Sequence, residues 1–223
     1  MATIVDCSMP IRTHWRWKPE LVQLAAHARG DRFQTSVLRV NVHGFTHVDA
    51  QLHYVPGAPS IDRVPLDIWV GEAAVLDVSH RGASEGITAA DLAAAGPHVR
   101  AGDIALVRTD WDARCSFETK EFWSTAPYFT REAAEWLRDR RVRAVGSDFP
   151  PDYPIRFEVV KPERPPAPED YVTHEFLLKH GIFLIEYLVN LKALTRPRVQ
   201  FLAVPIKIEG SDGAPARAFA ILD

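Results

Sequence analysis

Short runs of β-branched and aliphatic residues recur along the whole chain and alternate with segments of helical periodicity. Runs of this length and composition are typical of buried strands. The predicted strands are Ser36–Val42, Ala73–Val78, Ile104–Thr109, Val142–Val145, Phe183–Ile185, Gln200–Ile208 and Arg217–Leu222. The predicted helices are Pro19–Ala28, Ala89–Ala95, Arg131–Arg140 and Tyr171–Lys179. This alternation predicts an α/β fold, with a mixed β-sheet and flanking helices.

Local signals support the ends of several predicted helices. Thr88 precedes Asp91, and Thr130 precedes Ala133, which is the spacing of a helix N-cap. His180-Gly181 is typical of a helix end, because glycine adopts the left-handed conformation readily. A chain of 223 residues has the length of one well-packed domain, so we expect a single domain over residues 1–223.

Residues 150–168 interrupt this pattern, because seven of the seventeen prolines lie there. Proline lacks a backbone donor and fixes φ, so this segment cannot be regular structure throughout. Two interpretations stay open, a surface crossover loop and a stiff lid over a functional site. In the second, Tyr153, Arg156 and Phe157 are candidates to face a substrate.

The composition argues against several classes of partner. Hydrophobic residues make up 47% of the chain, charged residues 25%, and the net charge is −3. No basic excess indicates binding to nucleic acid or to an anionic membrane, and no apolar run reaches membrane-spanning length. Cys7 and Cys115 form neither a CxxC pair nor a disulfide framework, and the first residues lack the pattern of a signal peptide. We therefore expect a cytoplasmic protein.

Residues 43–53, with the sequence HGFTHVDAQLH, contain three of the nine histidines and an aspartate. Imidazole and carboxylate groups are the usual ligands of a catalytic divalent metal such as zinc. A single helix would place these side chains on different faces, and a single strand would separate its ends by roughly 33 Å. We therefore expect a bent backbone, with His43 at a strand end and His47, Asp49 and His53 on a curled loop or short helix. The alternative is a surface loop with unrelated polar residues.

A second pair of polar residues lies nearer the C-terminus. His174 belongs to the predicted helix Tyr171–Lys179, and Glu186 follows within an apolar run. A carboxylate in such a run is costly to bury unless it is paired or bound to a metal. A helix end at Gly181 would return the chain, so both side chains could reach one centre. The alternatives are a core arginine partner for Glu186 and an ordinary amphipathic-helix position for His174.

These residues resemble the metal-dependent cyclase family of hydrolases, which includes bacterial kynurenine formamidase, isatin hydrolase and a zinc-dependent dienelactone hydrolase. The family motif is His-x-Gly-Thr-His-x-Asp-x-Pro-x-His, and its matches in this chain are His43, Thr46, His47, Asp49 and His53. The chain departs from the motif at Phe45, where glycine is usual, and at Gln51, where proline is usual.

The resemblance extends over nearly the whole chain. The further matching segments are the strand that ends at Asp77, Thr109-Asp110-Trp111 (Thr-Gly-Trp in the family), His174 to Ile182, Glu186 to Leu191, and Pro205 to Arg217. The combined match implies the swivelling β/β/α cyclase fold. It is specific for the family and leaves the substrate open.

The resemblance implies a binuclear site for Zn2+ or Mn2+, although some members of the family use a single ion. The implied ligands are His43, His47 and Asp49 for the first ion, and Asp49, His174 and Glu186 for the second. Both carboxylates would bridge the ions, and His53 would act as the acid and base.

The resemblance also implies an activity and substrate contacts. The implied reaction is that of an arylformamidase, which hydrolyses the amide bond of N-formylkynurenine to give kynurenine and formate. Trp15 and Trp17 are candidate substrate contacts, with packing or a dimer interface as the alternative. Phe45 and Gln51 are further candidates, because they are the departures within the motif. The implied assembly is a homodimer or a higher homo-oligomer.

Other functions compete with this interpretation. Hydrolysis of a cyclic amide or a lactone is one alternative, and a non-catalytic metal-dependent small-molecule binding protein is another, although the intact His53 argues against it. Gly82-Ala83-Ser84-Glu85-Gly86 matches the serine-hydrolase pattern G-x-S-x-G, which needs a tight strand-to-helix turn. Ser84 is expected in mid-loop, so we do not expect a serine nucleophile. Cys115 has no histidine nearby in the sequence, and a partly buried thiol is the preferred interpretation.

Overall fold

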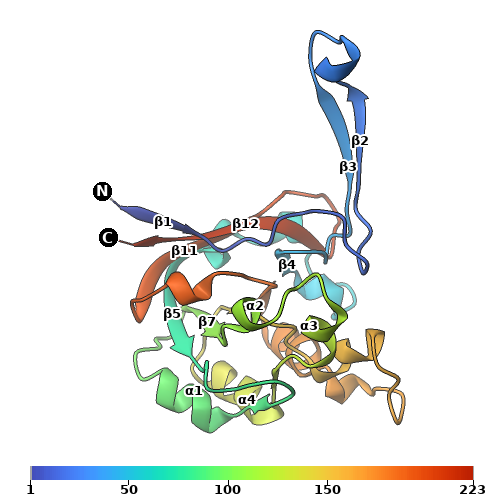
Figure 1. Cartoon of the computed structure of the whole chain (residues 1–223). Coiled ribbons are helices and arrows are strands. Elements are labelled where there is room, and N and C mark those ends of the chain that lie inside the picture. The colour runs from blue at the N-terminus through green and yellow to red at the C-terminus, as the bar shows by residue number, and fades with distance from the viewer. Residues whose placement is uncertain (1, 223) are drawn as a thin grey trace.

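The computed structural model describes residues 2–222, and its centre is a mixed eight-stranded sheet (Figure 1). The strand order is β1-β12-β11-β5-β7-β9-β10-β4, and β4 also pairs with β12. This last pairing closes the sheet into a barrel-like ring, while β1 pairs with the far end of β12 and brings the two termini together. The strands are β1 (Thr3–Asp6), β4 (His47–Asp49), β5 (Val70–Asp77), β7 (Ile104–Arg108), β9 (Ala144–Ser147), β10 (Phe183–Glu186), β11 (Arg198–Pro205) and β12 (Gly213–Leu222).

Two hydrophobic cores lie on the two faces of this sheet. Successive side chains of a strand point to opposite faces, and on β5 Ala73 and Val75 enter one core while Ala74 and Leu76 enter the other. The first core fills the inside of the ring. The second lies between the sheet and its helices, which are α1 (Ala89–Ala95), α2 (Trp111–Arg114), α3 (Lys120–Ser124) and α4 (Arg131–Asp139). The predicted mixed α/β fold is therefore confirmed.

The predicted N-caps of α1 and α4 are present. The Thr88 hydroxyl accepts a hydrogen bond from the Asp91 backbone N–H, and the Asp91 carboxylate accepts one from the Thr88 N–H at 2.7 Å. Thr130 caps α4 in the same way through the Ala133 N–H. Gly181 has a φ of +74°, as expected for a residue that ends a helix.

The Asp91 carboxylate makes a testable contribution to stability. Burial raises its pKa, but hydrogen bonds from Arg81 and Thr88 outweigh burial and hold the pKa below its usual value. A carboxyl group whose pKa is lower in the folded than in the unfolded state stabilises the fold at pH values above its unfolded-state pKa. This stabilisation is lost as the pH falls below about 4. We expect Asp91→Asn to lower the free energy of unfolding by about 2 kcal/mol at pH 7. Urea unfolding of both proteins should show this difference narrowing below pH 4, and a difference independent of pH would contradict the assignment.

The predicted helix Pro19–Ala28 is wrong. Glu20–Ala25 forms strand β2, which pairs with β3 (Thr35–Arg39) in an antiparallel hairpin outside the main sheet. Figure 1 shows this hairpin, here called the arm (residues 20–39), projecting away from the body of the protein. Leu21 lies opposite Leu38 and Val22 opposite Val37, so apolar cross-strand pairs replace the helix face that the local sequence indicated.

Other elements differ from their predicted form or were not predicted. The predicted helix Tyr171–Lys179 is a π-helix over Val172–Leu177 followed by a 3-10 turn at Leu178–His180. Strands β1 and β4 and the small pair β6 (Gly86–Ile87) and β8 (Tyr128–Phe129) were not predicted. The remaining 3-10 turns are His27–Arg29, Gln51–His53, Ile61–Arg63, Leu66–Ile68, Tyr153–Glu158, Pro168–Asp170 and Leu191–Ala193. Within residues 2–222, every helix is too short or too polar to cross a bilayer.

Candidate metal centre

The pairing of β4 with β10 places three of the predicted ligands together. His47 and Asp49 point to one face of β4, while Val48 between them enters the first core, which fills the inside of the ring. The antiparallel register puts Glu186 of β10 directly opposite His47. His47 and Asp49 therefore lie on a short strand, and not on the predicted curled loop or short helix. That prediction is correct only for His53, which lies on the 3-10 turn Gln51–His53. His43 lies in the turn before β4 rather than at the end of a strand.

Two imidazoles and two carboxylates converge at this position. His47 Nε2 lies 3.2 Å from Asp49 Oδ1 and 3.8 Å from Glu186 Oε2. His174, on the π-helix, has its Nε2 3.2 Å from Glu186 Oε1 and 3.5 Å from Asp49 Oδ2. All four side chains are buried. The side chains that pair with Glu186 are thus these imidazoles, rather than the core arginine considered as an alternative.

The donor atoms of this cluster suit a divalent metal ion. Asp49 Oδ2 and Glu186 Oε1 are buried and have no hydrogen-bond partner among residues 2–222. Burial of a carboxylate oxygen without a partner is costly, and a bound cation removes that cost. Imidazole nitrogen with carboxylate oxygen is a common ligand set for Zn2+ and also suits Mn2+. The residues present therefore fit a metal centre.

Hydrogen bonds on the far side of each ring orient the two imidazoles. His47 Nδ1 lies 2.8 Å from the carbonyl oxygen of Phe45, and His174 Nδ1 lies 2.6 Å from Asp152 Oδ2. With the proton on Nδ1 in each ring, both Nε2 atoms are free to act as ligands.

Phe45 has a φ of +61°, so the position at which the family motif has glycine does adopt the left-handed conformation.

Asp152 was not predicted as a functional residue. It is buried, and besides His174 Nδ1 its carboxylate accepts a hydrogen bond from the Thr173 backbone N–H at 2.7 Å. It belongs to the proline-rich segment, whose pattern carries no signal for a histidine partner 22 residues away. Asp152 therefore links that segment to the metal centre.

His43 and His53 form the other half of the cluster and share a second unpredicted residue, Asp212. His43 Nδ1 lies 2.7 Å from Asp49 Oδ1, and its Nε2 lies 2.8 Å from Asp212 Oδ2. His53 Nδ1 lies 3.2 Å from the same Asp212 oxygen, and the two rings stack with centroids 3.9 Å apart. A Cβ at Gly213 would lie 2.8 Å from His43 Cε1, so glycine is required where this ring packs on β12.

Three of the histidines near Asp49 have shifted pKa values, and the shifts differ in direction. Burial lowers the pKa of His53 to about 4, so this ring is neutral at pH 7. Burial also lowers the pKa of His43, but Asp49 and Asp212 outweigh it and raise the pKa to about 9. For His174, burial is outweighed by Glu186 and Asp152, and the pKa rises to about 10. His53 is therefore the ring suited to accept a proton, while His43 and His174 must lose protons before they bind a metal.

A cavity of about 310 Å³ opens onto this cluster. Its lining residues are Arg16, Asn41, His43, His47, His53, Tyr54, Ile155, Glu158, Tyr171, His174, Glu186 and Tyr187. The predicted substrate contacts Trp15, Trp17, Phe45 and Gln51 are outside this lining, and their contact with substrate stays a prediction. Trp17 packs on Phe45 with ring centroids 4.6 Å apart, and Gln51 Nε2 donates to the Leu178 carbonyl oxygen at 2.8 Å.

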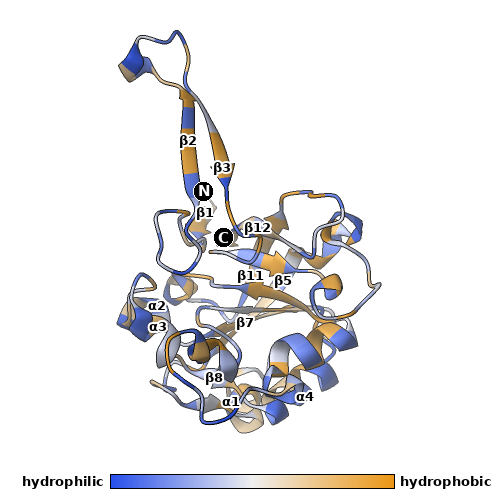
Figure 2. Cartoon of the chain, turned by 90° about the vertical axis from the view of Figure 1, so that its right-hand side faces the viewer, coloured by the Kyte–Doolittle hydropathy of each residue, from blue (hydrophilic) through white to orange (hydrophobic). Residues whose placement is uncertain are grey.

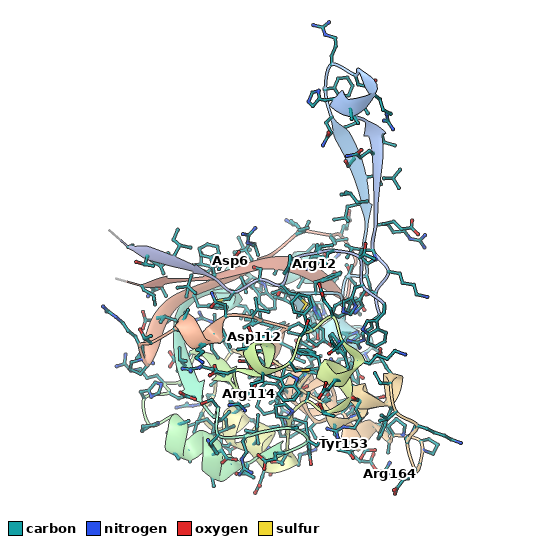
Figure 3. All side chains as sticks on the ribbon, viewed as in Figure 1. Asp6, Arg12, Asp112, Arg114, Tyr153 and Arg164 are labelled. Atoms are coloured by element: carbon teal, nitrogen blue, oxygen red, sulfur yellow. The ribbon has the colours of Figure 1, made fainter. Side chains whose placement is uncertain are left out.

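The proline-rich segment contributes different residues to the cavity from those predicted. Ile155 and Glu158 line it, whereas Tyr153, Arg156 and Phe157 line a separate cavity of about 370 Å³. Arg156 is buried against the ring of Tyr153, 3.8 Å from its centroid. Figure 3 shows Tyr153 and Arg164 on the outer part of this segment, far from the arm. The three substrate-facing candidates are therefore corrected, because Ile155 and Glu158 are the residues of this segment that line the cavity. The choice between a crossover loop and a lid stays a prediction.

The alternative nucleophiles lie where they were expected. Ser84 is in the loop between β5 and β6, so it does not occupy a strand-to-helix turn. Cys115 is a free, half-buried thiol that follows α2, with its Sγ 3.6 Å from Thr119 Oγ1. Neither lines the cavity at the metal centre.

Comparison with known proteins identifies the family. Residues 5–151 match the family model described as "Putative cyclase". The chain belongs to this cyclase family. The matched segment contains His43, His47, Asp49 and His53, whereas His174 and Glu186 lie beyond it.

Individual members of the cyclase family and solved structures are similar over most of the chain. The kynurenine formamidase of Erythrobacter litoralis is 32% identical over 181 residues, which cover 81% of this chain and 74% of that protein. A solved structure described as a potential metal-dependent hydrolase with cyclase activity is 27% identical, with a TM-score of 0.75 and coverage of 100% and 99%. Isatin hydrolase A from Labrenzia aggregata, bound to benzyl benzoate, shares the fold at 21% identity, with a TM-score of 0.83 and coverage of 99% and 94%. The resemblance inferred from the sequence is confirmed at the level of family and fold.

Proposed function

We propose that this cyclase-family protein is a metal-dependent amide hydrolase of the arylformamidase type, with N-formylkynurenine as substrate. The observation that carries the proposal is a pair of buried oxygens of Asp49 and Glu186, which face two oriented imidazoles and have no hydrogen-bond partner within residues 2–222. The similarity to kynurenine formamidases supports the choice of bond and substrate.

The proposed ligands are those that the family resemblance implies. His43, His47 and Asp49 would hold a first Zn2+ or Mn2+ ion, and Asp49, His174 and Glu186 a second. Such an ion supplies Lewis-acid chemistry, because it polarises a carbonyl group and lowers the pKa of water.

The proposed role of His53 is that of acid and base. Its Nδ1 is hydrogen-bonded to Asp212, so the unprotonated Nε2 of the neutral ring is available to accept a proton from water. The same atom would then return the proton to the leaving nitrogen. Asp212 would hold the ring in this tautomer and stabilise its protonated form.

Metal analysis combined with a hydrolysis assay tests the proposal. The purified protein should contain a stoichiometric divalent metal and release formate from N-formylkynurenine, and a chelator should abolish turnover. A matched assay with isatin and with a dienelactone tests the cyclic amide and lactone alternatives. Metal-loaded protein that hydrolyses none of these substrates would overturn the proposal in favour of a binding protein. Inhibition by a serine-directed reagent with indifference to the chelator would favour Ser84 instead.

We also propose that the arm mediates a homodimer. Figure 2 shows apolar residues along both of its strands, which lie away from either core. The large apolar side chains of the arm that are at least 49% exposed are Leu21, Val22, Leu24, Phe33, Val37 and Leu38. An isolated two-stranded hairpin is marginally stable in water, and a partner surface would stabilise it. A groove of about 500 Å³ on the body is lined largely by apolar residues of the N-terminal segment, β11 and β12, and would receive such an arm from a second copy.

We expect the double variant Leu21→Ser and Leu38→Ser to be monomeric, because it removes one apolar cross-strand pair from the proposed interface. Light scattering coupled to size-exclusion chromatography should give the mass of two chains for the unaltered protein and of one chain for the variant. Val160→Ser, which alters an exposed apolar residue outside the arm, should leave the dimer intact. A monomeric unaltered protein, or a dimeric double variant, would contradict the proposal.

The predicted cytoplasmic location stays a prediction.

A further inference from the structure

An arginine lies in the wall of the cavity that contains the metal centre. Arg16 follows β1 in the N-terminal segment, and its guanidinium carbon lies 4.4 Å from the ring centroid of Trp123, 5.3 Å from that of Trp17 and 5.8 Å from that of Tyr187. Only 14% of its side chain is exposed. Three aromatic rings therefore hold the guanidinium in place, although its polar edge faces the cavity.

The polar edge of Arg16 is occupied by a carboxylate of the same chain. Arg16 Nε donates to Glu158 Oε2 at 2.5 Å, and Nη2 pairs with Glu158 Oε1, so the contact is bidentate. The remaining nitrogen, Nη1, donates to the hydroxyl of Tyr187 at 3.1 Å. This fork is the geometry in which arginine binds carboxylates most strongly and most specifically.

The two partners are held very differently. Arg16 is fixed by its aromatic surroundings, whereas 46% of the Glu158 side chain is exposed. Glu158 ends the 3-10 turn Tyr153–Glu158 of the proline-rich segment, and its carboxylate contacts Arg16 from that side of the cavity. Because 46% of the Glu158 side chain is exposed, this carboxylate can be hydrated outside the cavity when another carboxylate takes its place, and the exchange leaves the buried guanidinium paired.

The ring of Tyr187 connects this arginine to the metal centre. Its centroid lies 5.2 Å from that of His47, while its hydroxyl accepts the hydrogen bond from Arg16. Tyr187 directly follows Glu186, the last residue of β10, so the backbone at the end of this strand fixes the separation between Arg16 and the metal centre. A ligand that reaches both must carry its carboxylate about one aromatic ring away from the group bound near His47.

We propose that Arg16 anchors the carboxylate of the substrate and that Glu158 occupies this position until the substrate displaces it. The inference rests on the proposed function and makes the free carboxylate of an N-formyl aryl amide a requirement for tight binding. Neutral cyclic amides and neutral lactones carry no carboxylate that could bind Arg16. Glu158 thus acts as an internal competitor for the same fork.

Kinetics with N-formylkynurenine and its methyl ester test the inference, because the two differ in the carboxylate alone. Arg16→Gln should raise KM for the acid by about 10- to 100-fold, as expected for loss of a charged hydrogen-bond pair, and change KM for the ester by less than about 3-fold. Glu158→Gln should lower KM for the acid by removing the competitor. Arg12→Gln is the matched control, because Arg12 pairs with Glu118 at 2.6 Å on the exposed surface and does not line the cavity. It should change neither KM.

Equal effects of Arg16→Gln on the acid and the ester would overturn the inference and leave Arg16 a structural residue. Retained ester hydrolysis shows that the variant is folded, and Arg16→Lys, which keeps the charge and loses the fork, provides a second measurement. Lysine should give a KM for the acid between those of the unaltered protein and the glutamine variant. A lysine variant indistinguishable from the glutamine variant on both substrates would also contradict a carboxylate anchor.

A binding measurement separates failure of this inference from failure of the proposed function. Trp17 and Trp123 pack on Arg16, so tryptophan fluorescence can report ligand binding without turnover. Titration with 4-phenylbutanoate should be at least 10-fold weaker for Arg16→Gln, while 4-phenylbutanol should bind both proteins alike. Arg16-dependent binding of the acid without formamide hydrolysis would overturn the proposed function alone. Formamide hydrolysis without this dependence would overturn the carboxylate anchor alone.

Discussion

Asp49→Asn is expected to abolish metal binding and to reduce turnover by at least about 1000-fold. Asp49 is fully buried, and its two oxygens face His43, His47 and His174. An amide keeps the size of the side chain but removes the charge at the centre of these rings, and its nitrogen cannot bind a cation. Elemental analysis of the purified variant should therefore show little metal, and the hydrolysis assay should show no measurable formate release.

The control for Asp49→Asn is Asp112→Asn. Asp112 also has a buried oxygen without a hydrogen-bond partner among residues 2–222, and burial raises its pKa, but it lies on α2 and outside the cavity lining (Figure 3). Asp112→Asn should retain the metal and the activity of the unaltered protein. A full complement of metal in Asp49→Asn would contradict its place as a shared ligand.

His53→Ala is expected to keep its bound metal and to lose turnover by about 100- to 10,000-fold, the range expected for loss of a general acid and base. The ring of His53, which is neutral at pH 7, lies beside the cluster, and the family resemblance implies proton transfer as its role. The measurements are metal content and kcat for N-formylkynurenine. Free imidazole should restore part of the activity, because the cavity left by the ring is open to small molecules.

Loss of metal together with turnover in His53→Ala would make His53 a ligand instead. The geometry allows this result to be recognised, because ligand atoms of His43, Asp49 and His53 lie within 4.8 Å of one another. His27→Ala, which removes an exposed histidine at the tip of the arm, is the control and should change neither metal content nor kcat.

Local sequence was a reliable guide where an element carries its own signals. Helix α1 begins after Thr88 because the hydroxyl and the Asp91 carboxylate cap it within four residues. The central strands β5 and β7 are apolar on both faces because both faces are covered, and such runs are recognisable without knowledge of their neighbours. The first strand of the arm, β2, was predicted as a helix, whereas the second, β3, overlaps the predicted strand Ser36–Val42. The apolar residues of β2 pack across a hairpin rather than along a helix face, and only the cross-strand register distinguishes the two.

The sequence by itself determined the family. It also predicted that residues from His43 to His53 share one centre with His174 and Glu186, because ligand chemistry restricts such positions to few residue types. Only the tertiary structure decided which acidic residues form hydrogen bonds with these histidines and with Arg16. Asp152 and Asp212 orient histidines that lie 22 and 159 or more residues away, and Glu158 meets Arg16 across 142 residues. Aspartate and glutamate are common on every protein surface, so their residue type carries no information about a partner. Their roles follow from the closed sheet, which brings β4, β10, β12 and the proline-rich segment to one cavity.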